Sequence, residues 1–92
     1  MANRIAGRPW VLDTATPGVP LWVSWIKISH IEYTGYAAAG NKAILNDVNG
    51  QLLWQATGDA TLEDKDSFKI GWVQGLILQQ IDGSGKVLVY IE

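Results

Sequence analysis

Four residues near the end of the chain, Gly83-Ser84-Gly85-Lys86, lie between two apolar runs and have the composition of a phosphate-binding loop. A Walker-type loop needs Gly-x-x-x-x-Gly-Lys followed by Ser or Thr, because backbone amides hold the phosphates and the hydroxyl holds magnesium. Here Gln80 stands at the first glycine position and Val87 at the hydroxyl position. The following run, 87–91, is β-branched and aromatic and favours a strand instead of the helix that would face an anion. The sequence therefore predicts a hairpin turn from Asp82 to Gly85 and no nucleotide cofactor.

A second place to look for chemistry is His30, the only histidine of the chain. A nucleophilic triad needs a base beside an oriented Ser or Cys, with a carboxylate behind the base. The neighbours Ser29 and Glu32 cannot take up that arrangement through sequence adjacency alone. Paired carboxylates for glycoside cleavage must face each other across a cleft, which a domain of this size rarely contains. We therefore predict a protein that is not an enzyme and has no catalytic residues.

Two acidic stretches could offer oxygen ligands to calcium. One contains Glu63, Asp64 and Asp66, and the other contains Asp47 and Asn49. An EF-hand loop requires a regular alternation of ligands that ends in a bidentate Glu, and neither stretch has this alternation. We expect solvated loops and turns here, with no metal site.

Composition narrows the classes of partner. With 92 residues the chain is expected to form one domain, and with no cysteine it has no disulfide and no Cys-based metal site. Seven Lys and Arg against nine Asp and Glu give a net charge of −2, so we expect no nucleic-acid partner. Lys27 and Gln79 interrupt the longest apolar stretches, and the first thirty residues do not resemble a secretion signal. We therefore expect no membrane partner and synthesis in the cytoplasm.

The fold class follows from periodicity. Turn signals recur at intervals of about ten residues and no segment sustains a three-to-four spacing, which predicts an all-β fold. We expect a small antiparallel sandwich or barrel of about six to eight short strands over residues 21–92. Asn49-Gly50 predicts a hairpin, with Ile44 and Trp54 as an inward-facing pair across it. The alternation of apolar residues changes phase at Ser29-His30, which predicts a bulge there.

The first 20 residues are predicted to form an extended N-terminal arm. They carry all three prolines of the chain, Pro9, Pro17 and Pro20, which interrupt regular strand pairing. Residues 8–13 could pair briefly as an edge strand. Because the arm begins with Arg4 and Arg8 and residues 59–66 are acidic, we expect a head-to-tail contact between copies, which can close into a ring.

Five tryptophans in one small domain are the main compositional excess. Trp25 and Trp54 lie within apolar strands and are predicted to be in the core. A domain of this size cannot enclose five indoles, so at least one of the others should contact another chain or a ligand: Trp10, Trp22 and Trp72. The predicted partner interface therefore consists of these three tryptophans with Arg4 and Arg8, and Trp10 is its apolar anchor.

Three runs of the chain carry a resemblance to a known group of proteins. They are Ile28-Ser-His-Ile-Glu-Tyr-Thr-Gly-Tyr, Lys42-Ala-Ile-Leu-Asn-Asp-Val-Asn-Gly-Gln-Leu-Leu-Trp, and Gly75-Leu-Ile-Leu with Gly85-Lys-Val-Leu-Val-Tyr-Ile. Together they resemble small β-sandwich virion proteins of tailed bacteriophages. The resemblance implies a structural protein of the particle, such as a capsid decoration (cementing) protein or a neck or tail accessory. It implies many copies, a homo-oligomer, contacts with the major capsid protein or other virion proteins, location in the virion, and no cofactor.

The alternative is a carbohydrate-binding module, because exposed Trp and Tyr residues of an all-β domain can stack on sugar rings. Trp22 and Trp25 cannot share a face of a regular strand, which weakens this reading. An exposed planar Trp pair in the free monomer would favour sugar binding. Tryptophans that are covered only in an assembly would favour the virion protein.

Overall fold

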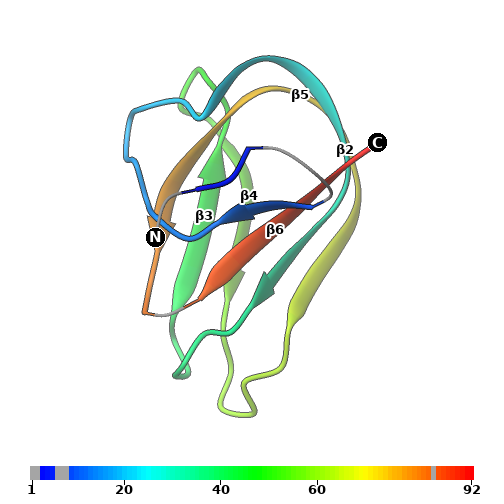
Figure 1. The fold of residues 1–92 in the computed structure, drawn as a ribbon. Coiled ribbons are helices and arrows are strands. Elements are labelled where there is room, and N and C mark those ends of the chain that lie inside the picture. The colour runs from blue at the N-terminus through cyan, green and yellow to red at the C-terminus, as the bar shows by residue number, and fades with distance from the viewer. Residues whose placement is uncertain (1–2, 6–8, 84) are drawn as a thin grey trace.

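The computed structural model describes residues 3–5, 9–83 and 85–92 (Figure 1). Its strands are β1 Trp10–Leu12, β2 Trp22–Thr34, β3 Lys42–Asn46, β4 Leu52–Thr57, β5 Lys65–Ile81 and β6 Lys86–Ile91. All pairs of neighbouring strands are antiparallel, in the order β1-β6-β2-β5-β3-β4. The predicted all-β class is confirmed, although β2 and β5, with 13 and 17 residues, exceed the expected short strands. Among the described residues no helix exists that could cross a bilayer.

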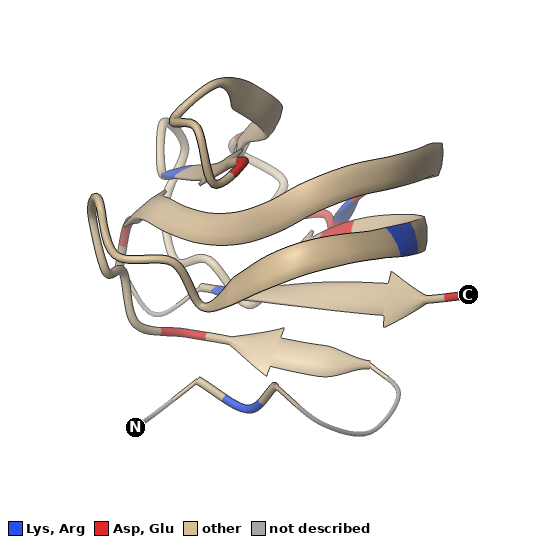
Figure 2. Ribbon diagram, turned by 90° about the horizontal axis from the view of Figure 1, so that it is seen from above, with Lys and Arg blue, Asp and Glu red and all other residues tan. Residues whose placement is uncertain are grey.

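The length of β5 allows one sheet to form two layers. Residues 65–76 of β5 pair with β2, whereas residues 77–81 pair with β3. Gly71 and Gly75 lie in the second half of the part that pairs with β2, before the change of partner, and have φ of 88° and 74°, a backbone region that favours glycine. As a result β3 and β4 lie behind β1 and β6 in Figure 1. Seen from above in Figure 2, β6 ends at the C-terminus and separates β1 from the rest of the sheet.

The core lies between these two layers and draws on nearly every strand. The largest fully buried side chains are Leu12, Ile28, Ile31, Tyr33, Leu45, Leu76, Leu78, Val87 and Val89. Both ladders of β2 shift register between Ile28 and His30, which confirms the predicted irregularity at Ser29-His30. The extra residue allows Ile28 and Ile31, three positions apart, to face the same core.

The β3–β4 hairpin forms where Asn49-Gly50 predicted it. The Asp47 carboxylate accepts hydrogen bonds from the amides of Asn49 and Gln51, each at 2.9 Å, and Gly50 has a φ of 82°. The connection spans residues 47–51, and the ladder shifts register between Leu45 and Asn46. Longer turns with a bulge move the register by one residue relative to a two-residue turn.

The core pair across this hairpin therefore differs from the prediction. Trp54 is buried, as expected, but it pairs with Leu45, which is fully buried. Ile44 pairs with Gln55 and is only half-buried on the other face of β3. The prediction of Ile44 as the partner of Trp54 is wrong by this single step of register.

The predicted hairpin at Asp82 to Gly85 is also wrong. The strands on either side, β5 and β6, are not neighbours, because β6 lies between β1 and β2. The segment instead passes from one layer to the other. Asp82 fixes this crossing to the start of β3, since its amide donates to the Lys42 carbonyl and its carboxylate accepts from the Lys42 amide, both at 2.9 Å. Ser84 lies outside the described residues.

The described part of residues 1–20 is joined to the sheet and does not form a separate arm. β1 pairs with β6 through Trp10 opposite Val89 and Leu12 opposite Val87. Arg4 forms a bridge to Val11 on the other side of β1. The boundary that the sequence suggested at residue 20 therefore cuts through hydrogen-bonded structure.

The proline-containing part of this segment covers an edge of β5. The Thr16 amide donates to the Leu78 carbonyl at 2.9 Å, and the Leu21 amide donates to the Leu76 carbonyl at 2.7 Å. Pro17 directly follows Thr16 and Pro20 directly precedes Leu21, so both prolines lie between the two hydrogen-bonded residues. Proline lacks an amide donor and is tolerated at sheet edges, which explains how the segment can line a strand without extending the ladder.

Candidate functional site

One end of the β2–β5 pair extends beyond the neighbouring strand. β6 pairs with β2 only from Ile28 onward, so residues 22–27 of β2 and 71–76 of β5 form a two-stranded segment, which we call the ribbon. In Figure 1 these parts of β2 and β5 arch together over the top of the sheet.

The outer side of the ribbon carries exposed apolar side chains. Trp25 is 61% exposed, Trp72 is 65% exposed and Val23 is 62% exposed; together we call them the aromatic face. Trp25 pairs with Gln74 and Trp72 pairs with Lys27. The two tryptophans are therefore diagonal neighbours on one side of the ribbon, a spacing that aromatic side chains can bridge. Trp72, which the sequence analysis placed in a partner interface, is therefore exposed, and its role at an interface stays a prediction.

The prediction of Trp25 as a core residue is wrong. Ile26 and Ile28 point into the core, so the alternation of the strand turns Trp25 outward. The apolar residues on both faces of β2 were the available signal. That signal alone does not say which of the two faces is covered by the second layer.

Trp10 and Trp22 lie on the opposite side of the sheet from the aromatic face. Trp10 is only 7% exposed and belongs to the core cluster, with its ring 5.3 Å from that of Trp22 at a tilt of 55°. This burial corrects the prediction of Trp10 as the apolar anchor of a partner interface, because the pairing of β1 with β6 turns Trp10 into its own core. Trp22 is 37% exposed, so part of its indole remains available. Arg4 is exposed, while Arg8 lies outside the described residues.

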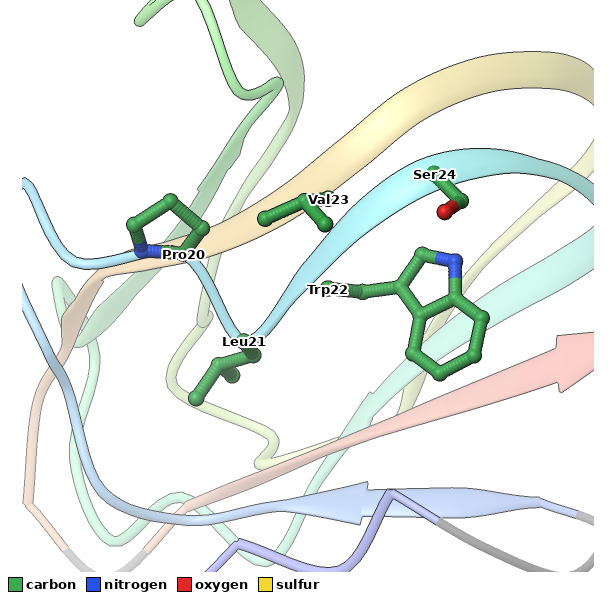
Figure 3. A pocket seen from close by; sticks show the side chains of 5 residues that line it. All are labelled: Pro20, Leu21, Trp22, Val23 and Ser24. Carbon is green, nitrogen blue, oxygen red and sulfur yellow. The ribbon is translucent and has the colours of Figure 1, made fainter.

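A shallow hollow accompanies the start of β2. Its volume is about 200 Å³ and it is lined by five consecutive residues, Pro20, Leu21, Trp22, Val23 and Ser24. Figure 3 shows the Trp22 indole and the Val23 side chain on opposite sides of the β2 backbone. The hollow thus runs along the strand.

The edge of β2 beside this hollow has no strand paired with it among the described residues. The last contact on this side is the Lys27 carbonyl, which accepts a hydrogen bond from the Glu92 amide at 2.9 Å. Lys27 and Glu92 also form an exposed ion pair at 3.6 Å. Amides and carbonyls of alternate residues point to the same side of a strand, so those of Trp25 point toward this open edge.

The other candidate residues have structural contacts. The His30 ring stacks on Tyr90 with centroids 3.9 Å apart and an angle of 15°. In the part of the chain that the structure describes, no three His, Cys, Asp or Glu residues are grouped so that they could hold a metal ion.

The acidic residues gather at the end of the β2–β5 pair away from the ribbon. Glu32 pairs with Asp66, and the Asp64 carboxylate accepts a hydrogen bond from the Thr34 hydroxyl at 2.6 Å. Burial raises the pKa of Glu32, and its hydrogen bond with Asp64 and the charges of Asp66 and Asp64 raise it further. Nearby, a hydrogen bond from Lys65 holds the pKa of Asp59 well below its usual range.

The fold and the surface together define a small all-β domain with an exposed aromatic face on a two-stranded ribbon. Comparisons with protein-family models, with curated proteins and with solved structures find no match for the chain. The role of the domain is therefore argued from this surface.

Replacing Glu32 with Gln is expected to stabilise the protein at pH 7. Because the pKa of Glu32 is raised in the folded state, the charged form opposes folding at any pH above the ordinary carboxyl value. Removing the charge opposite Asp66 should contribute roughly 0.2–1 kcal/mol, the range for cross-strand pairs. Thermal melts should show the gain at pH 7, and it should vanish as the pH falls through the raised pKa toward the ordinary value.

The matched control is Glu63→Gln, because Glu63 is exposed and contacts Tyr36 through its backbone carbonyl only. This variant should have the melting temperature of the original protein both at pH 7 and in acid. A lower melting temperature for Glu32→Gln at pH 7, or a gain that persists in acid, would contradict the cause assigned to the pKa shift.

Proposed function

We propose that the protein is a non-enzymatic structural protein of a bacteriophage particle, acting as a capsid decoration (cementing) protein. In this proposal it contacts the major capsid protein or another virion protein through the aromatic face, since Trp10 is used in its own core. The observation that carries the proposal is the exposure of Trp25 and Trp72 side by side on the ribbon. Trp is the residue most enriched among those that dominate binding energy at protein interfaces.

The size of the aromatic face fits the centre of an interface. A Trp side chain buries about 150–250 Å², so two that are mostly exposed offer roughly 200–300 Å². A standard interface buries about 800 Å² on each partner, with an apolar centre and a polar rim. Lys27 and Gln74, which pair with the two tryptophans, would lie at that rim. The resemblance of the strand runs to virion proteins supports a particle as the partner.

The test is the location and binding of the protein in purified virions. The original protein should be a component of the particles. The double variant Trp25→Ala/Trp72→Ala should fold normally, because both side chains are exposed, and should bind particles that lack the protein at least about thirtyfold more weakly, as for a hot-spot loss of 2 kcal/mol.

The matched control is Leu52→Ala, which removes an apolar side chain of similar exposure from β4 at the other end of the sheet. It should bind particles with the original affinity. Absence of the protein from purified virions, or full binding by the double variant, would overturn the proposal.

A specific observation favours a second function, carbohydrate binding. Trp25 and Trp72 are exposed on one face in the monomer, and each has a polar side chain opposite it that could bond to sugar hydroxyls, Gln74 and Lys27. Titration with oligosaccharides while tryptophan fluorescence is monitored would test it. Saturable quenching that Trp72→Ala abolishes would favour a sugar ligand, whereas an unchanged signal would leave the protein interface as the use of this face.

A further inference from the structure

We propose that Asn49 is a site of spontaneous deamidation, and that its conversion loosens the contact between the β3–β4 turn and the ribbon. Asn49 stands before Gly50 at the tip of the turn that joins these two strands. The modification itself is independent of the proposed function. Its effect on binding to particles rests on that function and gives it a form of regulation.

The reaction closes a ring between the backbone and the Asn49 side chain. The Gly50 backbone nitrogen loses its proton to solvent and forms a bond to Asn49 Cγ. The bond from Cγ to the side-chain nitrogen breaks, and this nitrogen takes a proton from solvent and leaves as ammonia. Water then opens either carbonyl bond of the five-membered succinimide, which leaves an aspartate or an isoaspartate at position 49. One water is consumed, one ammonia is released, and no oxidant or reductant takes part.

Both reacting groups are accessible in the fold. Asn49 and Gly50 are exposed, and the Asn49 carboxamide has no hydrogen bond to the part of the chain that the structure describes. A side chain at position 50 would meet no atom within 4 Å, so the space beside the Gly50 α-carbon is open. The Gly50 amide donates to the Asp47 carbonyl at 3.0 Å, a bond within the turn itself. Local opening of the turn therefore frees the attacking nitrogen without unfolding of the sheet.

The other three asparagines of the chain are less suited to the reaction. None of them precedes a glycine, so a side chain crowds the attacking nitrogen at each: Asn3, Asn41 and Asn46. The carboxamide of Asn3 makes three hydrogen bonds. The amide after Asn41 donates to the Asp82 carboxylate at 2.9 Å, and the amide after Asn46 donates to the Gln51 carbonyl at 2.8 Å. Opening these bonds would disturb both ends of β3.

Asp82-Gly83 offers an internal comparison, because an aspartate before glycine can form the same succinimide with loss of water. The Asp82 carboxylate accepts hydrogen bonds from the Lys42 amide at 2.9 Å and from the Gln80 side chain at 3.1 Å. These bonds hold the carboxylate against the start of β3. We therefore expect isoaspartate at position 49 and none at position 82.

The turn that contains Asn49 lies directly against the ribbon. The Val48 amide donates to the Gln74 carbonyl at 2.9 Å. A methyl group at Gly75 would lie 2.8 Å from Val48 Cβ, closer than side chains approach one another, so Val48 packs onto the backbone of β5. Gln74 pairs with Trp25 of the aromatic face. The turn therefore holds the backbone that carries this face.

Isoaspartate alters the turn that positions Val48. It adds one methylene to the backbone between positions 49 and 50, and the Asp47 carboxylate holds the amides on either side, those of Asn49 and Gln51, each at 2.9 Å. Both products also add one negative charge beside Asp47, which takes the net charge from −2 to −3. Loss of the bond between Val48 and Gln74 should weaken binding through the aromatic face about two- to tenfold, the contribution of one hydrogen bond.

Ageing of the purified protein at pH 7 tests the site. Mass spectrometry of proteolytic fragments should show deamidation at Asn49 at least tenfold faster than at any other asparagine, with isoaspartate among the products. Asn49→Gln is the matched control, because it keeps the carboxamide but its longer side chain cannot close a five-membered ring. It should stay unmodified. Equal rates at all four asparagines, or aspartate without isoaspartate, would overturn the inference.

Hydrogen exchange tests the contact with the ribbon in the absence of particles. The added charge allows the isoaspartate form to be isolated by ion exchange. In this form the Val48 amide should exchange at least tenfold faster, while the Leu21 amide, which donates to the Leu76 carbonyl, should be unchanged. Freshly purified Asn49→Asp adds the charge without the methylene and should protect the Val48 amide as the original protein does. Equal exchange at Val48 in the original and isoaspartate forms would overturn the loosening of the turn.

Binding to particles that lack the protein distinguishes this inference from the proposed function. The isoaspartate form should bind about two- to tenfold more weakly than fresh protein, whereas Asn49→Gln should bind equally before and after ageing. Equal binding of the fresh and isoaspartate forms would overturn the regulation and leave the proposed function standing. If isoaspartate forms at position 49 but neither form binds particles, the modification site stands and the proposed function is overturned.

Discussion

Removal of residues 1–20 is expected to unfold the domain. The truncation takes Trp10 and Leu12 out of the core and exposes the edge of β6 to which they are paired. Loss of a buried Trp costs about 3–5 kcal/mol and loss of a buried Leu about 2–5 kcal/mol. A domain of this size has only about 5–14 kcal/mol of total stability, so the truncated chain should show no cooperative thermal transition in circular dichroism.

The truncation removes core side chains and also shortens the chain, and single substitutions test the first effect alone. Leu12→Ala should lower the free energy of unfolding by about 2–5 kcal/mol. Val11→Ala is the matched control, because Val11 is its neighbour on the other face of β1 and is only half-buried. A truncated domain that melts cooperatively near the original temperature, or equal effects of the two substitutions, would show that β1 is dispensable for the fold.

The features that the sequence predicted correctly depend on nearby residues. Asn49-Gly50 sets up a hairpin through the φ of Gly50 and the Asp47 carboxylate, all within five positions. The irregularity at Ser29-His30 follows from the phase of the apolar residues around it. Such signals require no knowledge of which strands become neighbours, and the all-β class is the sum of them.

The features that it missed depend on strands far apart in the chain. Asp82 to Gly85 has the composition of a hairpin turn, but β6 finds its partners in β1 and β2, so the same residues serve a crossing between layers. From the local sequence, the prolines in residues 1–20 predicted an extended arm. In the fold Pro17 and Pro20 are accommodated at an edge of β5, where a missing amide does no harm.

The candidate site was predictable only in part for the same reason. The excess of tryptophan indicated that some indoles must be exposed, and Trp72 is among them. The choice between Trp25 and Trp10 required the pairing of β1 with β6, which buries Trp10, and the outward turn of Trp25 on β2, whose neighbour Ile26 faces the core. Neither fact is encoded in the local pattern of either tryptophan.

Trp54→Ala should be among the most destabilising single substitutions in the protein. The side chain is 6% exposed, lies opposite Leu45, and its Nε1 donates a hydrogen bond to the Ser67 hydroxyl at 2.8 Å. This bond connects β4 to β5 across the core. Truncation to Ala should lower the free energy of unfolding by about 3–5 kcal/mol, measured by urea denaturation. Trp54→Phe should lose less, since it removes the hydrogen bond, worth about 0.5–1.5 kcal/mol, but keeps most of the packing.

Trp72→Ala provides the matched control, because it removes the same side chain from the exposed aromatic face. Exposed positions away from special contacts change stability by about 0.5 kcal/mol or less, so its denaturation midpoint should stay close to that of the original protein. Together the variants separate the two uses of tryptophan: Trp54 should matter for stability and Trp72 for binding to particles. Equal shifts of the midpoint for the two Ala variants would contradict both the core position of Trp54 and the free surface on which the proposed interface depends.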